Sequence, residues 1–177
     1  GDWLATGINA SPGAATGVGA ILRAHYAPAI RVIRSMDQPV IAAVNGVAAG
    51  AGFSLALACD IRIAGESATF VQAFVRIGLI PDMGSTYFLP RLIGPARAAE
   101  LTMLGETVAA ARALQFGIVN RVVADVDLMS VTNEIATRLA RGPRSIALTK
   151  QALAASAQND LDAQLAVKER LQTEAST

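Results

Sequence analysis

The fold is decided by residues 40 to 54, which read VIAAVNGVAAGAGFS. The first five residues, 40 to 44, are apolar at every position, which is typical of a strand buried on both faces. Asn45 and Gly46 then favour a turn. The small residues that follow, from 48 to 59, predict a helix that packs closely against its neighbours. This stretch therefore predicts a buried strand that turns into a helix.

The Gly-Ala-Gly run in this stretch also has a chemical interpretation. A helix that begins at Gly50, Ala51 and Gly52 leaves main-chain N–H groups without partners, and almost no side chain covers them. Together with the positive end of the helix dipole, such groups can bind an anion or a developing oxyanion. Close helix packing explains the same small residues equally well. On the residues alone, both interpretations stay open.

The residues on either side of this stretch extend the pattern to a mixed α/β domain. Upstream, apolar residues at three-and-four spacing predict a helix over residues 21 to 35. Downstream, residues 60 to 64 and 68 to 70 predict two further strands. Later helices are expected over residues 95–104, 108–116, 127–141, 144–155 and 161–173. This order predicts a layered α/β core over residues 1–123 and a helical region over residues 124–177.

The composition of the 177 residues limits the class of protein. Hydrophobic residues make up 53% and charged residues 16%, which excludes disorder and leaves less surface charge than soluble domains usually carry. Part of the surface is therefore expected to lie against another chain. The net charge of +1 and the scattered basic residues favour no nucleic-acid partner.

Membrane, metal and disulfide chemistry find little support in the sequence. Residues 40 to 59 carry no charge and are long enough to cross a bilayer, but their glycines and Asn45 argue against a membrane span. One Cys, Cys59, and one His, His25, cannot form an intrachain disulfide or the usual zinc site. We therefore expect no membrane contact and no metal. Since no signal peptide is visible, we expect a cytoplasmic setting.

A second candidate site lies in residues 74 to 86, which read FVRIGLIPDMGST. Asp82 follows Pro81 there and stands among apolar residues. As an N-cap, Asp82 would simply begin a helix, since Asp is favoured at that position. As a carboxylate in apolar surroundings, it would have a raised pKa and could perform acid-base work near neutral pH. Without further context the cap is the more ordinary interpretation.

Several segments resemble, in the family's order, the enoyl-CoA hydratase/isomerase, or crotonase, superfamily. They are PVIAAVNG at residues 39–46, the Gly-Ala-Gly turn, residues 55–64, IGLIPD at 77–82, LPRLIG at 89–94, and residues 109–123. The resemblance implies a spiral of ββα units with a C-terminal helical trimerisation region. It also implies acyl-CoA thioester substrates and a homotrimer or homohexamer. No separate cofactor is implied, because coenzyme A is part of the substrate.

The resemblance assigns the oxyanion site to main-chain groups. The N–H of Ala51, with the adjacent N–H of Gly52, is expected to hold the thioester oxygen while it becomes enolate-like. Loss of one such donor typically costs about 3 kcal/mol of transition-state stabilisation. The family's second donor comes from an upstream motif, and Gly1 and Asp2 are expected to be its last residues. We therefore interpret the chain as a trimmed portion of a larger domain.

The resemblance also favours isomerisation over hydration. Hydration in this superfamily uses two glutamates, whose places are held here by Ser54 and Phe74. Asp82 falls where several isomerases of the superfamily have a single acid-base carboxylate, so it is the expected catalytic residue. Residues expected to line the substrate are Gly50, Ser54, Phe74, Leu79 and Pro81.

The most similar branch of the superfamily suggests a substrate. Residues 47–52 and 73–82 resemble the isomerases that convert ring-epoxidised phenylacetyl-CoA and also shift double bonds in enoyl-CoA. Double-bond isomerisation is the expected reaction class, and an aromatic acyl group is the expected specific substrate.

Two other classes of protein stay open. The chain could be a catalytically silent acyl-CoA-binding subunit in which Asp82 only caps a helix. It could also be a nucleotide-binding oxidoreductase, although Leu55 replaces the third glycine of the dinucleotide motif and no Lys follows the turn.

Overall fold

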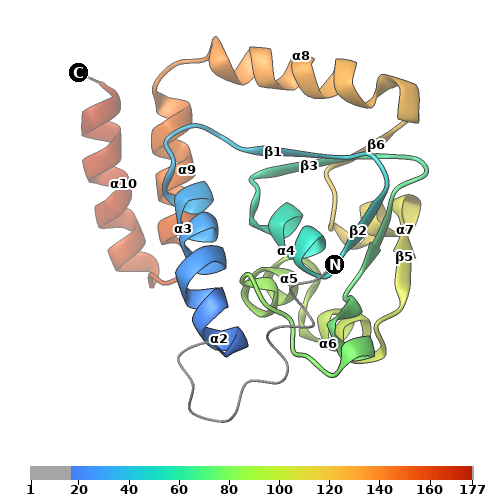
Figure 1. The fold of residues 1–177 in the computed structure, drawn as a ribbon. Coiled ribbons are helices and arrows are strands. Elements are labelled where there is room, and N and C mark those ends of the chain that lie inside the picture. Colours follow the sequence, from blue (N-terminus) through green and yellow to red (C-terminus); the bar gives the residue numbers. More distant parts are fainter. Residues whose placement is uncertain (1–16, 177) are drawn as a thin grey trace.

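Residues 17 to 176 are described in the computed structural model, and they form two three-stranded sheets surrounded by helices (Figure 1). The first sheet has the order β1-β3-β6, with all strands parallel, and consists of Ile41–Val44, Ile61–Gly65 and Arg121–Val123. The second has the order β2-β4-β5, with β2 and β4 parallel and β5 antiparallel, and consists of Val47–Ala49, Thr69–Val71 and Thr107–Ala109. Gly1 and Asp2 lie outside the described residues.

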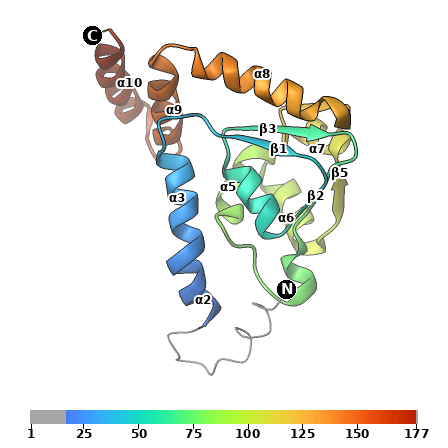
Figure 2. The same cartoon turned by 45° about the horizontal axis from the view of Figure 1, so that its top comes forward.

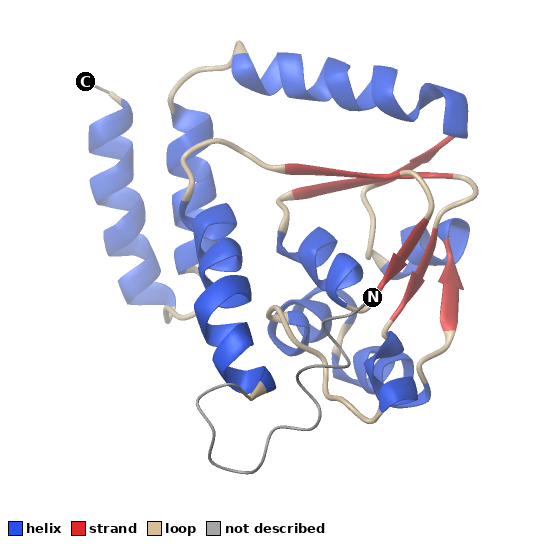
Figure 3. Ribbon diagram, in the orientation of Figure 1, coloured by secondary structure: helices blue, strands red, loops and turns tan. Residues whose placement is uncertain are grey.

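Strands β1 to β4 alternate between the two sheets, and this alternation builds a ββα spiral. The chain passes from β1 to β2 at Gly46 and continues into helix α4, Ala51–Ala58. In the next turn of the spiral, β3 and β4 lead to a 3₁₀ helix, Ala73–Ile77, and to α5, Ser85–Ile93. Figure 3 shows that the two sheets run in different directions, with these helices packed beside them. The expected α/β spiral fold is confirmed.

The remaining elements are helical apart from β5 and β6. α2 (Val18–Ile21), a π-helical turn (Leu22–Tyr26) and α3 (Ala27–Ser35) form one continuous stretch where a helix was expected. The later helices are α6 (Pro95–Leu104), α7 (Ala110–Phe116), the 3₁₀ turn Asp125–Asp127, α8 (Leu128–Ala140), α9 (Ser145–Ala155) and α10 (Leu161–Ala175). α8 crosses β1 and β3, while α3, α9 and α10 stand to one side of the sheets (Figure 2). That residues 124–177 form a separate domain stays a prediction.

Two expectations for the stretch that decides the fold are wrong. The helix expected from residue 48 begins only at Ala51, because Val47–Ala49 pairs with Thr69–Val71 as β2. The strand expected to be buried on both faces is only partly buried. In the described part of the chain, β1 pairs with β3 alone and so stands at the edge of its sheet.

The core fixes α4 between the two sheets and the helices that follow. Phe53 of α4 and Phe70 of β4 are 1% and 0% exposed, and their ring centroids are 5.3 Å apart. Leu57, one turn further along α4, is also buried. Each such side chain contributes about 2 to 3 kcal/mol by burial. Because α4 is anchored along its length, the positions of both its ends are fixed.

Candidate active site

The two candidate segments leave the second sheet side by side. β2 and β4 are parallel, and their last residues, Ala49 and Val71, are partners in the ladder. The next residue, Gly50, donates its N–H to the carbonyl of Val71 at 3.0 Å. The Gly turn and the segment that carries Asp82 therefore start from the same sheet edge, which is where parallel sheets commonly present their sites.

The turn at Gly50 requires glycine. Its φ of 50° and ψ of −116° lie outside the regions that side-chain-bearing residues adopt. Ser54 stabilises the turn, because both its N–H and its hydroxyl donate to the carbonyl of Gly50, at 2.9 and 3.1 Å. Since Ser54 is fully buried and its hydroxyl is used in this way, it supports the turn. Its expected contact with substrate stays a prediction.

The first N–H groups of α4 are unpaired. Those of Ala51 and Gly52 have no hydrogen-bond acceptor in the described part of the chain, and the first helical bond is the one that Ser54 donates to Gly50. Ala51 is partly exposed and Gly52 is exposed. These two N–H groups, at the positive end of the helix dipole, can therefore donate hydrogen bonds to an oxyanion.

Phe74 covers the other side of the turn. It is 7% exposed, and its ring lies 3.6 Å from the point where a Cβ on Gly50 would stand. Its carbonyl accepts the N–H of Leu79 at 3.0 Å, which folds the 3₁₀ helix back toward the Asp82 segment. The positions of Ser54 and Phe74 thus provide no carboxylate beside the turn, and both residues are buried.

The segment from residue 72 to residue 85 is closed by a buried side-chain bridge. Gln72 Nε2 donates to Ser85 Oγ at 2.5 Å, and the two residues are each 1% exposed. Within this closed loop, the carbonyl of Asp82 accepts the N–H of Ser85 at 3.0 Å, which forms a tight turn. Met83 has a positive φ of 48° and Gly84 a φ of 78°. Met83 is the only residue other than glycine with positive φ in the described chain, so the turn beside Asp82 carries backbone strain.

Asp82 does not cap a helix. The N-cap of α5 is Gly84, and no side chain caps that helix. Asp82 is half-buried, and its Oδ1 is buried without a hydrogen-bond partner. Burial raises the pKa of the Asp82 carboxyl above its ordinary value, and a hydrogen bond from its own main chain only partly opposes this. A carboxyl that is desolvated and has one oxygen without a partner is suited to exchange a proton.

A cavity of about 560 Å³ adjoins this turn. It lies between the π-helical turn with α3 on one side and Met83 with Gly84 on the other. Leu22, Tyr26 and Ile30 form much of its wall. Its lining does not include Asp82 or the Gly50 turn. The structure thus brings Phe74 against Gly50 and closes the Asp82 loop, while the joint contact of Asp82 and Ala51 with one substrate stays a prediction.

Sequence reasoning missed Gln72, Ser85 and Met83. The signal for Gln72 is a single amide within the apolar run TFVQAFV, residues 69 to 75, since a polar side chain there must find a buried partner. No comparable signal marks Met83, because its strain depends on the local backbone.

The described residues contain no group of three or more His, Cys, Asp or Glu side chains that could hold a metal ion. Nor do they contain a helix that is both long and apolar enough to cross a membrane.

The fold and the turn define a class of protein, a ββα spiral that presents unpaired main-chain N–H groups at the start of a buried helix. A family model described as enoyl-CoA hydratase/isomerase matches residues 7 to 177. The chain belongs to the enoyl-CoA hydratase/isomerase family, as the resemblance of its segments implied.

Relatives within the family carry different activities in their names. A probable enoyl-CoA hydratase from Rhodobacter capsulatus is 45% identical and is matched over 98% of this chain and 65% of its own length. A 1,2-epoxyphenylacetyl-CoA isomerase from Escherichia coli is 45% identical over 86% of this chain and 59% of its own length. The chain thus spans about six tenths of these relatives.

Solved structures of hydratases and isomerases also superpose on the chain. An enoyl-CoA hydratase/isomerase from Cupriavidus metallidurans superposes with a TM-score of 0.87 at 34% identity, over 99% of this chain and 65% of that chain. A monofunctional enoyl-CoA isomerase from M. smegmatis has a TM-score of 0.72 at 43% identity, over 77% of this chain and 65% of that chain.

Proposed function

We propose that the protein is an acyl-CoA isomerase that shifts a double bond by proton transfer. The thioester oxygen is held by the N–H of Ala51, with that of Gly52 beside it. Asp82 removes a proton from one carbon of the acyl chain and returns it to another. The observation that carries this proposal is the buried, unpaired Oδ1 of Asp82, in a loop that leaves the sheet beside two unpaired N–H groups.

The reaction balances without any other reactant. Asp82 as carboxylate takes a proton from the carbon at one end of the future dienolate, and the electron pair moves onto the thioester oxygen. When the carbonyl re-forms, the pair returns to the carbon at the far end, which takes the proton back from Asp82. General acid-base catalysis of this kind typically contributes about two to four powers of ten in rate. Substrate and product are isomers, so no water is consumed.

Two features beside the turn disfavour hydration. A hydratase must hold and activate a water molecule, which in this family is the task of two glutamates. Here Ser54 and Phe74 are both buried, the serine hydroxyl is bonded to Gly50, and the Phe74 ring packs on the turn. Neither side chain can take a proton from water near neutral pH. Relatives named as hydratases and as isomerases are equally similar at 45% identity, so the argument depends on these residues.

The substrate we propose is an acyl-CoA thioester with an aromatic acyl group. The resemblance of residues 73–82 to the phenylacetyl-CoA branch supports this, as does the name of the Escherichia coli relative. The cavity beside Met83 is lined by Leu22, Tyr26 and Ile30 together with Arg23 and Arg31, and is large enough for a ring. Gly50, Leu79 and Pro81 are proposed as further substrate contacts.

The assembly we propose is a homotrimer or homohexamer. Large apolar side chains are exposed on the C-terminal helices and beside them, as on Val126, Met129 and Leu165. Apolar side chains that the single chain leaves exposed are candidates for burial in such an assembly. A cytoplasmic location stays a prediction.

The test compares Asp82→Asn with the unchanged chain on a 3-enoyl-CoA substrate. We expect isomerisation to fall by about two to four powers of ten, because the proton carrier is lost. The matched control is Asp162→Asn, at an exposed position of α10, which should keep full activity. Unchanged turnover in Asp82→Asn would remove Asp82 as the proton carrier. Acyl-CoA binding without turnover in the unchanged chain would leave the silent binding subunit as the better account. Release of 3-hydroxyacyl-CoA as the main product would contradict the isomerase.

A further inference from the structure

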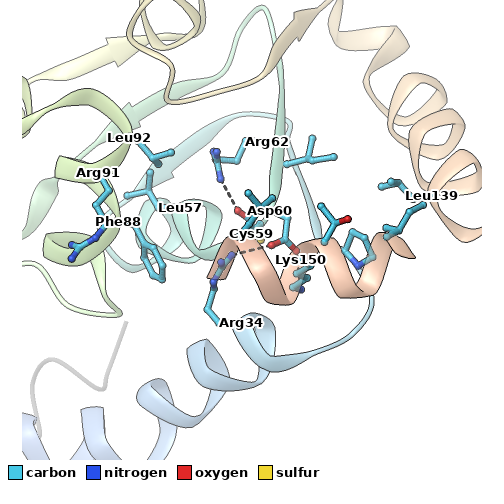
Figure 4. Close-up of a pocket in the computed structure, with 15 residues that line it drawn as sticks. Arg34, Leu57, Cys59, Asp60, Arg62, Phe88, Arg91, Leu92, Leu139 and Lys150 are labelled. Atoms are coloured by element: carbon cyan, nitrogen blue, oxygen red, sulfur yellow. Dashed lines mark hydrogen bonds and ion pairs between the residues drawn. The ribbon is translucent and has the colours of Figure 1, made fainter. Parts of the chain in front are cut away.

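A second cavity lies at the opposite end of α4 from the Gly50 turn. It has a volume of about 470 Å³ and is formed between α3, the end of α4, α5 and α9 (Figure 4). α4 has 8 residues and is therefore about 12 Å long, which separates this cavity from the unpaired N–H groups at its start. The cavity is thus distinct from the candidate active site.

Two of the cationic side chains in this cavity, Arg34 and Lys150, are paired with Asp60. One carboxylate oxygen of Asp60 pairs with Arg34 Nη1 at 2.9 Å, and the other pairs with Lys150 Nζ at 2.8 Å. Lys150 Nζ also donates to the carbonyls of Ile33 and Gln38, each at 2.9 Å. Lys150 therefore has no donor left for a ligand.

Arg62 is different, because no carboxylate lies within ion-pair distance of it in the described part of the chain. Arg62 is 5% exposed, and its Nε and Nη1 donate to the carbonyls of Ile118 and Cys59, each at 2.6 Å. Its other amino group, Nη2, has no hydrogen bond among the described residues, yet it is not one of the atoms sealed from solvent. Burial lowers the pKa of Arg62, as expected for a cation without an ion-pair partner.

The cavity wall combines this cation with apolar surface. Four cationic side chains, Arg34, Arg62, Arg91 and Lys150, line the cavity against the single acidic side chain of Asp60. Much of the remaining wall is apolar, and includes Leu57, Phe88, Leu92, Ile146 and Leu153. Figure 4 shows Arg62, Asp60, Cys59 and Arg34 converging, with Leu57, Leu92 and Phe88 on one side of them. An excess of positive charge beside apolar walls is complementary to an anion that has an apolar part.

We infer that this cavity binds a small amphipathic carboxylate, whose charged group accepts from Arg62 Nη2 and whose apolar tail packs on Leu57 and Leu92. A carboxylate fits better than a phosphate, because one free amino group can serve a carboxylate oxygen but leaves most phosphate oxygens without donors. The inference does not depend on the proposed isomerase activity.

The test measures binding of hexanoate, hexanamide and inorganic phosphate by calorimetry and by ligand-observed NMR. Hexanoate should bind, and hexanamide should bind about tenfold more weakly or worse, because a charge-assisted hydrogen bond is lost. Equal binding of the acid and the amide would overturn the role of Arg62. Binding of phosphate but not of hexanoate would overturn the amphipathic ligand.

Variants then locate the binding site. Leu153→Trp places an indole at the exposed cavity rim and should weaken hexanoate binding about tenfold, by blocking the cavity. Leu161→Trp is the matched control, since Leu161 is similarly exposed but does not line the cavity. Hexanoate binding that survives Leu153→Trp, or that both variants weaken equally, would contradict the location. Arg62→Met should abolish hexanoate binding. Because Arg62 also donates to two main-chain carbonyls, this variant could fail to fold, and the comparison of Leu153→Trp with Leu161→Trp then decides the location.

Discussion

The two ends of α4 contrast in how their polar groups are satisfied. At the N-terminal end, the N–H groups of Ala51 and Gly52 are unpaired, and Oδ1 of the nearby Asp82 is buried without a partner. At the C-terminal end, Asp60 accepts from Arg34, from Lys150 and from the N–H of Val40. The same short, well-packed helix thus has unused main-chain donors at one end and, at the other end, a carboxylate whose two oxygens are both paired.

The unpaired polar groups at the N-terminal end of α4 and the paired carboxylate at its C-terminal end suggest different roles for the two ends. Unpaired buried polar groups cost free energy, so a fold keeps few of them unless they serve a ligand or a reaction. Only three buried side-chain atoms without partners occur in the described chain, and two of them, on Gln72 and Asp82, belong to the closed loop of residues 72 to 85. We therefore expect substitutions at the C-terminal end to affect mainly stability and those at the N-terminal end mainly activity.

The largest effect on stability is expected for Asp60→Ala. This change leaves Lys150, which is 7% exposed, and Arg34 without their carboxylate. Breaking a buried pair in this way costs about 3 kcal/mol of the free energy of unfolding. Urea denaturation measures this loss, with Asp37→Ala as the control, because Asp37 is exposed and its side chain, among residues 17 to 176, accepts a hydrogen bond only from the Gln151 amide. If Asp60→Ala lowered the free energy of unfolding no more than Asp37→Ala does, the paired groups at the C-terminal end of α4 would not be the ones that stabilise the fold.

Gly50→Ala should affect both stability and activity. The φ of 50° at Gly50 strains any side-chain-bearing residue by about 2 kcal/mol, although a Cβ there would meet Phe74 only at ordinary contact distance. Since relief of the strain moves the N–H groups that follow, isomerisation should fall about a hundredfold. Gly46→Ala is the control, because a Cβ there meets nothing within 4 Å and its φ is not positive. Retained activity in Gly50→Ala would show that these N–H groups do not act on the substrate.

The smallest effect is expected for Met83→Gly. Glycine removes the strain of the positive φ beside Asp82 but adds backbone entropy to the unfolded chain, so stability should rise by about 0.5 kcal/mol. The same replacement at Met103, an exposed position within α6, should lower stability by about 1 kcal/mol. Thermal unfolding compares the two variants. The same sign at both positions would argue against strain at Met83.

Features of the fold and the site could be predicted from the sequence where several local signals agree. Helix α6 was predicted with both its ends, because Pro95 suits the first turn of a helix and Gly105, with a φ of 62°, ends it. The Gly turn and Asp82 were identified from residue types together with the family resemblance. Such signals lie within a few residues of the feature they predict.

What could not be predicted depends on partners distant in the chain. Ala48 and Ala49 are small and fit a helix equally well, and they become part of β2 only through pairing with β4, about twenty residues later. The bridge from Gln72 to Ser85 joins two ends of a loop, so no local pattern predicts it. Asp82 was expected either as a cap or as an acid, and the cap failed because the backbone turn makes Gly84 the N-cap.

The pKa of Asp82 also links its environment to pH. Burial raises this pKa above the ordinary value of 3.8, so the folded state retains the proton in a pH range where the unfolded state has released it. The contribution of Asp82 to stability therefore falls as pH rises from the ordinary pKa through the raised one. The carboxylate needed as a base forms only above the raised pKa.

The most direct test of this account is the pH dependence of kcat/KM for isomerisation of a 3-enoyl-CoA. For the unchanged chain we predict that the rate falls at acidic pH, with a midpoint above 3.8, the ordinary pKa of Asp. In Asp82→Asn, the low rate that remains should not show this fall. A fall with its midpoint at the ordinary value, or the same fall from full rate in Asp82→Asn, would contradict the assignment of Asp82 as the proton carrier.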